Sequence, residues 1–125
     1  MGEVLIARDE GLNRVVALKR LHPEQSGNRA LMRRFYTEAQ VTAQLRHPSI
    51  VSVHELGKDE QDRIFFTMEE VRGATLSEVI EELHQVSGPT AWGRTASGWT
   101  LERVVEAFRR ACEAVAYAHA RGVVH

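Results

Sequence analysis

The chain has 125 residues, with 16 basic and 17 acidic side chains and a formal net charge of −1. This balance lacks the positive surplus typical of nucleic-acid-binding proteins, so we expect no nucleic-acid partner. A hydrophobic content of 43% together with 26% charged residues is typical of a soluble globular protein.

Cysteine content and hydropathy also limit where the chain can reside. The only cysteine, Cys112, excludes an intramolecular disulfide and fits a reducing compartment. No apolar stretch approaches the ~18 residues that span a bilayer, and the first residues lack the features of a signal peptide. We therefore expect a cytoplasmic location with no membrane contact from this segment, while tethering of the full-length protein through a downstream segment stays open.

The first third of the chain predicts a hairpin followed by a helix. Residues 3–8 and 14–21 read as β-strands on either side of a Gly-containing turn at 9–13, which is the pattern of an antiparallel hairpin. A helix is expected from about residue 29 to residue 46, and Pro48 ends it, because the residue before a proline avoids helical dihedrals. The stripe that predicts this helix recurs every three or four positions and comprises Leu31, Phe35, Ala39, Thr42 and Leu45.

The middle third predicts a second strand pair and a short helix. Residues 50–53 and 63–71 are rich in strand-forming residues and flank a turn at 57–60. Thr75 and Glu78 have the spacing of a capping box, so we expect a helix from there to about Leu83.

The last third predicts a loop and then a long helix. Residues 84–99 lack periodicity, and half of them are Gly, Ser, Thr or Pro, which indicates a surface loop or insertion. Thr100 is expected to cap a helix that reaches about Arg121, with Gly122 as its left-handed stop. Cys112 is expected to be a small core residue on the apolar face of this helix rather than a nucleophile.

A strand lysine is the first candidate functional residue. Alternation along residues 14–21 places Ala17 and Lys19 on one face, so a planar base could lie on Ala17 while the ammonium of Lys19 reaches its phosphates. The plainer alternative is a solvated lysine on an edge strand. Because Lys19 and Lys58 are the only lysines among the 16 basic residues, a requirement for a compact ammonium is favoured at this position.

A helix glutamate is the second candidate. Glu38 lies between Phe35 and Ala39, inside the apolar stripe rather than opposite it. A carboxylate at such a position needs a partner, because an unpaired buried charge is costly, and Lys19 on the covered sheet is the natural one. A glutamate at the rim of the helix whose carboxylate reaches water is the alternative.

Other candidates have plainer explanations. The six histidines have no tight metal-binding spacing, so no metal ligands are expected within the chain. Adjacent glutamates at 69–70 and 81–82 point in different directions and are expected to be solvated. Trp92 and Trp99 are expected to pack locally within the 84–99 loop.

Several sequence motifs occur together in one order along the chain. They are Gly2-Glu3-Val4, Val16-Ala17-Leu18-Lys19, Arg34-Phe35-x-x-Glu38-Ala39, Leu45-x-His47-Pro48-x-Ile50-Val51, Met68-Glu69-x-Val71-x-Gly73, and the segment from His119 to His125. Together they resemble the small lobe of protein kinases and the approach to the kinase catalytic loop, most closely in bacterial Ser/Thr kinases. The resemblance covers nearly the whole chain, with residues 84–99 as the exception.

The resemblance implies an α+β fold in which an antiparallel sheet and one large helix form a kinase-like small lobe. Residues 1–73 would be a partial small lobe and hinge, without the first strand and the start of the Gly-rich loop. Residues 74–125 would be the start of the large lobe, truncated after its first helices, with the loop at about 84–99 as an insertion.

The resemblance also implies roles on the phosphate side of an ATP site. Gly2 and Val4 would be the last glycine and the valine of the phosphate-covering loop. Val4 and Ala17 would sandwich the adenine, and Lys19, braced by Glu38, would hold the α- and β-phosphates.

The adenine edge would be bound by residues of the hinge. Met68 would be the gatekeeper at the back of the pocket, Glu69 would contribute its carbonyl, and Val71 would contribute its backbone groups. Because these contacts are made by the main chain, neighbouring side chains can vary.

The implied activity is that of a Ser/Thr protein kinase, which moves the γ-phosphoryl of ATP to a hydroxyl of a protein substrate. His125 would be the histidine of the His-Arg-Asp motif, and the catalytic aspartate and the Mg²⁺ ligands would lie beyond it, so we expect this segment alone to be inactive. A pseudokinase or regulatory nucleotide-binding scaffold is the alternative, and a free-standing α+β domain with a structural Lys19–Glu38 pair is a third. The apolar face of the last helix is expected to stay exposed and to make the isolated segment poorly soluble.

Overall fold

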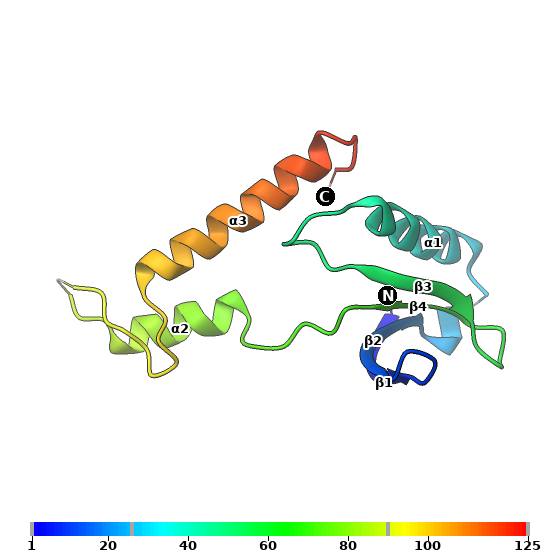
Figure 1. Cartoon of the computed structure of the whole chain (residues 1–125), viewed down its shortest axis with the longest axis horizontal. Coiled ribbons are helices and arrows are strands. Elements are labelled where there is room, and N and C mark those ends of the chain that lie inside the picture. The colour runs from blue at the N-terminus through cyan, green and yellow to red at the C-terminus, as the bar shows by residue number, and fades with distance from the viewer. Residues whose placement is uncertain (1, 26, 90, 125) are drawn as a thin grey trace. The chain divides into compact units, whose positions relative to one another are not determined.

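The computed structural model of the protein describes residues 2–25, 27–89 and 91–124. The chain divides into two compact units, residues 1–71 and residues 72–125. The first unit holds a sheet and one large helix, and the second holds two helices joined by a long connection (Figure 1). Within the described residues, no helix is both long and apolar enough to cross a membrane.

A four-stranded antiparallel sheet forms the body of the first unit. Its strands are β1 (Gly2–Asp9), β2 (Arg14–Leu21), β3 (Val53–Lys58) and β4 (Ile64–Met68), in the spatial order β1-β2-β4-β3. The first predicted hairpin is therefore confirmed. The second strand pair is present but shifted, because Gly57 and Lys58 of the predicted turn lie in β3 and β4 ends at Met68. Residues 50–52 lie outside β3 because the amide of Ile50 donates to the His47 carbonyl at 3.0 Å and closes a turn there.

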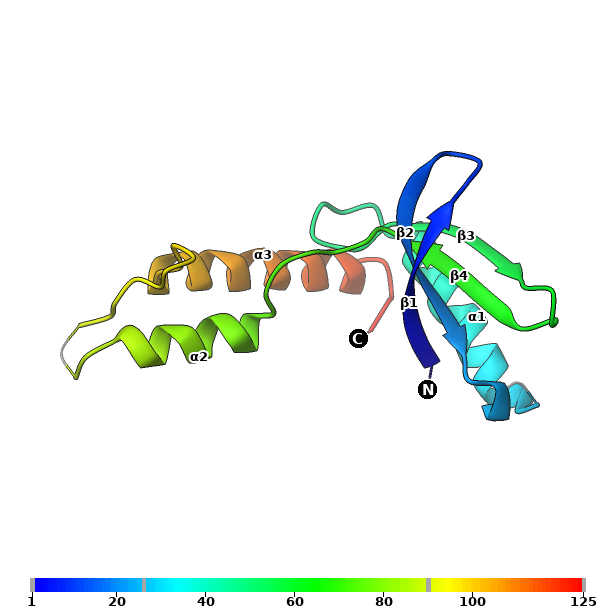
Figure 2. The same ribbon diagram turned by 90° about the horizontal axis from the view of Figure 1, so that it is seen from below.

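One helix, α1 (Arg29–Gln44), lies along one face of this sheet (Figure 2). A short 3-10 helix, Pro23–Gln25, precedes it, and the side chain of Asn28 caps it by accepting from the amides of Ala30 and Leu31. The helix ends two residues before the predicted position. The backbone leaves the helical conformation at Leu45, which is extended with φ −89° and ψ 109°. The helix therefore ends before Pro48, and a residue before a proline avoids helical dihedrals.

The core of the first unit lies between α1 and the sheet. It comprises Leu21, Phe35, Ala39, Ile64 and Phe66, all of them buried. The rings of Phe35 and Phe66 pack at a centroid separation of 5.0 Å and an interplanar angle of 47°. Burial of each Leu, Ile or Phe side chain in this core contributes roughly 1.5–3 kcal/mol, so this layer positions β2 and α1 against one another.

The second unit consists of α2 (Leu76–Val86) and α3 (Leu101–His119). The predicted capping box is confirmed, since the side chain of Thr75 accepts from the amide of Glu78 and the Glu78 carboxylate accepts from the Thr75 amide. Thr100 caps α3 as expected. The prediction for Cys112 is wrong, because this residue is exposed rather than part of a core.

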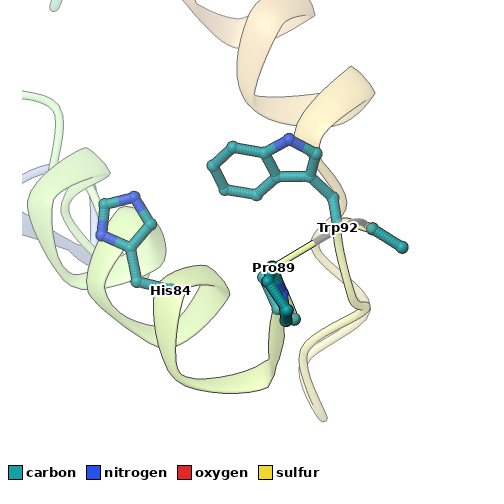
Figure 3. Close-up of a pocket in the computed structure, with 6 residues that line it drawn as sticks. His84, Pro89 and Trp92 are labelled. Atoms are coloured by element: carbon teal, nitrogen blue, oxygen red, sulfur yellow. The ribbon is translucent and has the colours of Figure 1, made fainter.

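The connection between α2 and α3 begins later than predicted. α2 continues to Val86, so the irregular segment begins at Ser87. Ser87 links α2 to the irregular segment. Its hydroxyl donates to the Leu83 carbonyl at 2.6 Å and accepts from the Gly93 amide at 3.0 Å. Figure 3 shows the imidazole of His84 and the indole of Trp92 facing one another across a pocket, with ring centroids 5.8 Å apart.

Candidate functional site

The two candidate charged residues meet between β2 and α1. The ammonium of Lys19 donates a hydrogen bond to Oε1 of Glu38, which joins the strand to the covering helix. Strand alternation directs the Lys19 side chain to the helix side, and the stripe position of Glu38 directs its carboxylate back to the sheet. The partner that the sequence suggested for Glu38 is thus the one observed.

An aromatic ring supports the lysine from the neighbouring strand. Phe66 is the register partner of Lys19 in β4, and the Lys19 ammonium lies 5.6 Å from the centre of its ring. The negative face of an aromatic ring attracts a cation at such a separation. Phe66 is itself fixed in the core by Phe35, so it holds the stem of Lys19 in a defined place.

Exposure decides how much this ion pair contributes to stability. The side chains of Lys19 and Glu38 are 22% and 41% exposed, which leaves the charges partly hydrated. Ion pairs in such surroundings typically stabilise a fold by about 0–1 kcal/mol. This small contribution to stability is therefore a weak reason for Lys19 and Glu38 to be paired.

Apolar candidate residues share the face on which Lys19 lies. Residues directly opposite in antiparallel strands project to the same side, and Val4 is opposite Lys19 while Met68 is opposite Ala17. Ala17 is 5% exposed, whereas Val4 is 54% exposed. One face of β1, β2 and β4 therefore carries a strip made of Val4, Ala17, Lys19 and Met68. The strip combines the small side chain of Ala17 with the ammonium of Lys19.

The segment after β4 is tied to the sheet at Glu69, and beyond that residue Val71 is exposed. The amide of Glu69 donates to the Ser52 carbonyl at 3.0 Å, which ties this segment to the residue before β3. Val71 is 74% exposed, and no hydrogen bond joins its backbone to any other residue in the described part of the chain. Its amide and carbonyl are thus available to a ligand.

Gly2 occupies a position that only glycine can fill. A Cβ added there would lie 2.6 Å from the carbonyl oxygen of Arg20, in the strand that pairs with β1. This close backbone approach explains the glycine without any ligand. Beside it, the Arg20 guanidinium donates to Glu3 at 2.7 Å, and this hydrogen bond lowers the pKa of the Glu3 carboxyl.

The sequence predicts no metal ligands within the chain and places only one catalytic-loop residue, His125, in it. Residues 2–25, 27–89 and 91–124 contain no group of three or more His, Cys, Asp or Glu side chains that could hold a metal ion. His125 lies outside the described residues.

Phe66 is the site residue that sequence analysis missed. Its strand was predicted, but its contact with Lys19 depends on the register between β2 and β4, which sequence patterns did not specify. The signal that could have found it is a large aromatic residue in the strand predicted to lie under the same helix.

Comparison with known proteins gives a consistent result. The family description "Protein kinase domain" matches residues 1–125. The chain is 34% identical over 127 residues to the serine/threonine-protein kinase PknD of Protochlamydia amoebophila. It is 35% identical over 126 residues to the protein of the same name from Chlamydia felis. Both matches take in the whole chain, which spans only 12% and 13% of the length of these relatives.

Solved structures agree with the sequence matches. The crystal structure of the Mycobacterium tuberculosis PknI kinase domain superimposes with a TM-score of 0.70 and 28% sequence identity. This alignment covers all of the chain and 45% of that domain. The expected α+β class, with an antiparallel sheet and one large helix, is thereby confirmed.

Proposed function

The chain belongs to the protein kinase domain family, and on that premise we propose that its first unit forms one wall of the ATP site of a serine/threonine kinase. The observation that carries the proposal is the contact between the Lys19 ammonium and the Glu38 carboxylate. A compact ammonium fixed by a carboxylate is suited to hold the α- and β-phosphates of ATP in one place. Phe66 restricts the lysine further from below.

The apolar strip next to Lys19 supplies the place for the adenine. Ala17 and Val4 project from the same side of the sheet, so both would make van der Waals contact with the same face of the base rather than sandwich it. Met68 bounds the strip where β2 meets β4. The free amide and carbonyl of Val71, together with the carbonyl of Glu69, would bind the polar edge of the base.

The proposed reaction is transfer of the γ-phosphoryl group of ATP to a hydroxyl of a protein substrate. In such reactions the protein contributes mainly by positioning the reactants and stabilising charge. The residues named here hold and orient the nucleotide and exchange no proton with the substrate. We therefore propose that residues 1–125 bind ATP but do not catalyse transfer without further parts of the protein.

The two lysines of the chain provide a matched experiment. Lys19→Met and Lys58→Met are made in the protein at its natural length, and ATP binding and phosphoryl transfer to a protein substrate are measured. Lys58 pairs with Asp62 at 2.6 Å in the β3–β4 turn, so its loss should leave both quantities unchanged. Lys19→Met should reduce transfer by on the order of 10²-fold or more, as loss of a group that stabilises transition-state charge does.

A Lys19→Arg variant tests whether the compact ammonium is needed. A planar guanidinium cannot occupy the same place between Glu38 and the phosphates, so activity should stay low. Equal transfer by the Lys19→Met and Lys58→Met proteins would refute the proposed role of Lys19. ATP binding without transfer in the unaltered protein would instead identify a regulatory nucleotide-binding scaffold.

A further inference from the structure

A tight turn precedes α3 and presents a serine at its tip. The amide of Gly98 donates to the Thr95 carbonyl at 2.9 Å, which closes a turn over residues 95–98. Thr95 is buried, and its hydroxyl accepts from the Trp99 amide at 2.9 Å, so the turn is fixed from inside. Ser97 is exposed at the third position of the turn.

Two arginines converge beside this serine. The terminal nitrogens of Arg94 and Arg103 each lie 3.5 Å from the point that a Cβ on Gly98 would occupy. Arg103 is held in place, because it donates to the Gly98 carbonyl at 2.8 Å and its guanidinium carbon lies 4.9 Å from the centre of the Trp99 ring. Two guanidinium groups are thus brought to the residue next to Ser97.

Among the described residues, the two arginines at this turn have no carboxylate bonded to them, and the nearest acidic contact of the turn is the one between Ser97 and Glu82. In the described part of the chain, neither Arg94 nor Arg103 forms an ion pair with a carboxylate. Farther along α3, the helix that carries Arg103, both Arg109 and Arg110 pair with Glu106. Two unpaired cations at one point repel each other, so an anion bound there would relieve the repulsion as well as accept their hydrogen bonds.

We propose that Ser97 is a phosphorylation site whose phosphate is held by Arg94 and Arg103. The donor is Mg-ATP and the catalyst is a serine/threonine kinase acting on this chain. Oγ of Ser97 forms a bond to the γ-phosphorus, the bond from that phosphorus to the β–γ bridging oxygen breaks, and ADP leaves with the electron pair. The hydroxyl proton passes to a base of the acting kinase.

Phosphorylation would exchange the partners of the turn. The unmodified hydroxyl of Ser97 donates to Oε2 of Glu82 in α2 at 3.1 Å. A phosphoserine has no hydroxyl proton to donate and carries about −1.5 to −2 charges at neutral pH, so it repels Glu82 and attracts the arginines. The turn would lose its side-chain contact with α2 and gain one with Arg103 of α3.

Phosphate capture is tested by placing phosphoserine at position 97 through genetic encoding and titrating its ³¹P signal. The second pKa of a free phosphoserine is about 6. Two neighbouring cations should lower it by about one unit, and the combined Arg94→Gln and Arg103→Gln substitutions should restore it. Arg109→Gln is the matched control, because it removes the same charge from α3 at a place where carboxylates already neutralise it, and it should leave the pKa unchanged.

An unshifted phosphate pKa in the unaltered protein would overturn the capture site, as would a shift that survives removal of both arginines. The acceptor role is tested by mass spectrometry of the protein purified from its native cells. Cleavage after Arg94 and Arg103 releases residues 95–103, and phosphate is expected on Ser97 rather than on buried Thr95 or the capping residue Thr100. Recovery of this peptide without any phosphorylated form, or with phosphate only on a threonine, would overturn it. Neither test uses the kinase activity proposed for this chain.

Discussion

At the scale of the residue, Val71 and Ala17 differ in what they can offer a ligand. Ala17 is 5% exposed and contributes a surface, whereas Val71 is 74% exposed and contributes its unbonded main chain. A hydrogen bond to the Val71 amide would form only with a ligand present. Its removal should therefore affect binding far more than folding.

Substitution at Val71 separates the main-chain contribution from the side-chain one. Val71→Pro removes the amide proton, while Val71→Ala keeps it and shortens the exposed side chain. One lost hydrogen bond of about 0.5–1.5 kcal/mol corresponds to an affinity for ATP that is up to about tenfold weaker. Calorimetric titration should show this loss for Val71→Pro alone, with similar melting temperatures for both variants. A tenfold loss in Val71→Ala would show that the side chain binds instead.

The direction of single side chains in the site could be predicted where the periodicity of one strand or helix determines it. Strand alternation directed Lys19, and the helix stripe directed Glu38, so their pairing followed from two local patterns. The contact with Phe66 did not follow, because it depends on which residues of β2 and β4 lie opposite. Glu38 was expected inside an apolar stripe, yet its side chain is 41% exposed because it lies at the edge of the covered face.

At the scale of the element, α3 carries a group of ion pairs between side chains three or four residues apart. Glu106 accepts from both Arg109 and Arg110, at distances of 2.8 and 3.0 Å. The Arg109 and Arg110 hydrogen bonds lower the pKa of Glu106 from 4.5 to about 2. A carboxyl whose pKa is lower in the folded state stabilises that state above its unfolded pKa, and this contribution disappears as acid protonates it.

The stabilisation by Glu106 should therefore be complete above pH 4.5 and should disappear as the pH falls from 4.5 to about 2. Melting temperatures of the unaltered and Glu106→Gln proteins should differ at pH 6 and converge at the acid end of this range. Glu102→Gln, on the same helix but without an arginine partner in the described residues, controls for general titration of carboxyls. A difference between the unaltered and Glu106→Gln proteins that stays constant down to pH 2 would contradict this account.

Element boundaries were predictable where caps marked them and less so elsewhere. Thr75 and Thr100 both cap the helices they were expected to cap. The end of α2 was missed, because residues 84–86 show no periodicity and the helix is ended by Ser87, whose hydroxyl bonds back to Leu83. A serine at this position gives no strong stop signal in sequence, unlike the glycine at 122.

At the scale of the whole molecule, the order of the motifs predicted the α+β class, and the resemblance that they carry implied a division of the chain after residue 73. Large apolar side chains are exposed on the β1–β2 hairpin and also on α3, where Val105, Phe108 and Val115 are 59%, 60% and 40% exposed. Exposed apolar side chains on one helix promote association in water. We therefore predict that a polypeptide of residues 1–125 associates through this helix face.

A change of one residue on that face should reduce association. Phe108→Ser removes the largest exposed ring of α3, so light scattering of the 1–125 polypeptide should report smaller particles than for the unaltered sequence. Leu12→Ser is the matched control, because Leu12 is 68% exposed in the β1–β2 turn, away from α3 in the sequence. A larger effect of Leu12→Ser would locate the associating surface on the hairpin instead.

The central claim, that Lys19 holds the phosphates of a bound nucleotide, is tested most directly by chemical labelling. An acyl-phosphate derivative of ATP transfers its acyl group to an amine that lies beside the phosphates, forming an amide and releasing ATP. Within residues 1–125 the only lysines are Lys19 and Lys58, so peptide mapping gives a clear answer. The account predicts labelling of Lys19 that excess ATP abolishes, with little labelling of Lys58. Equal labelling of the two lysines, or labelling of Lys19 that ATP does not reduce, would contradict it.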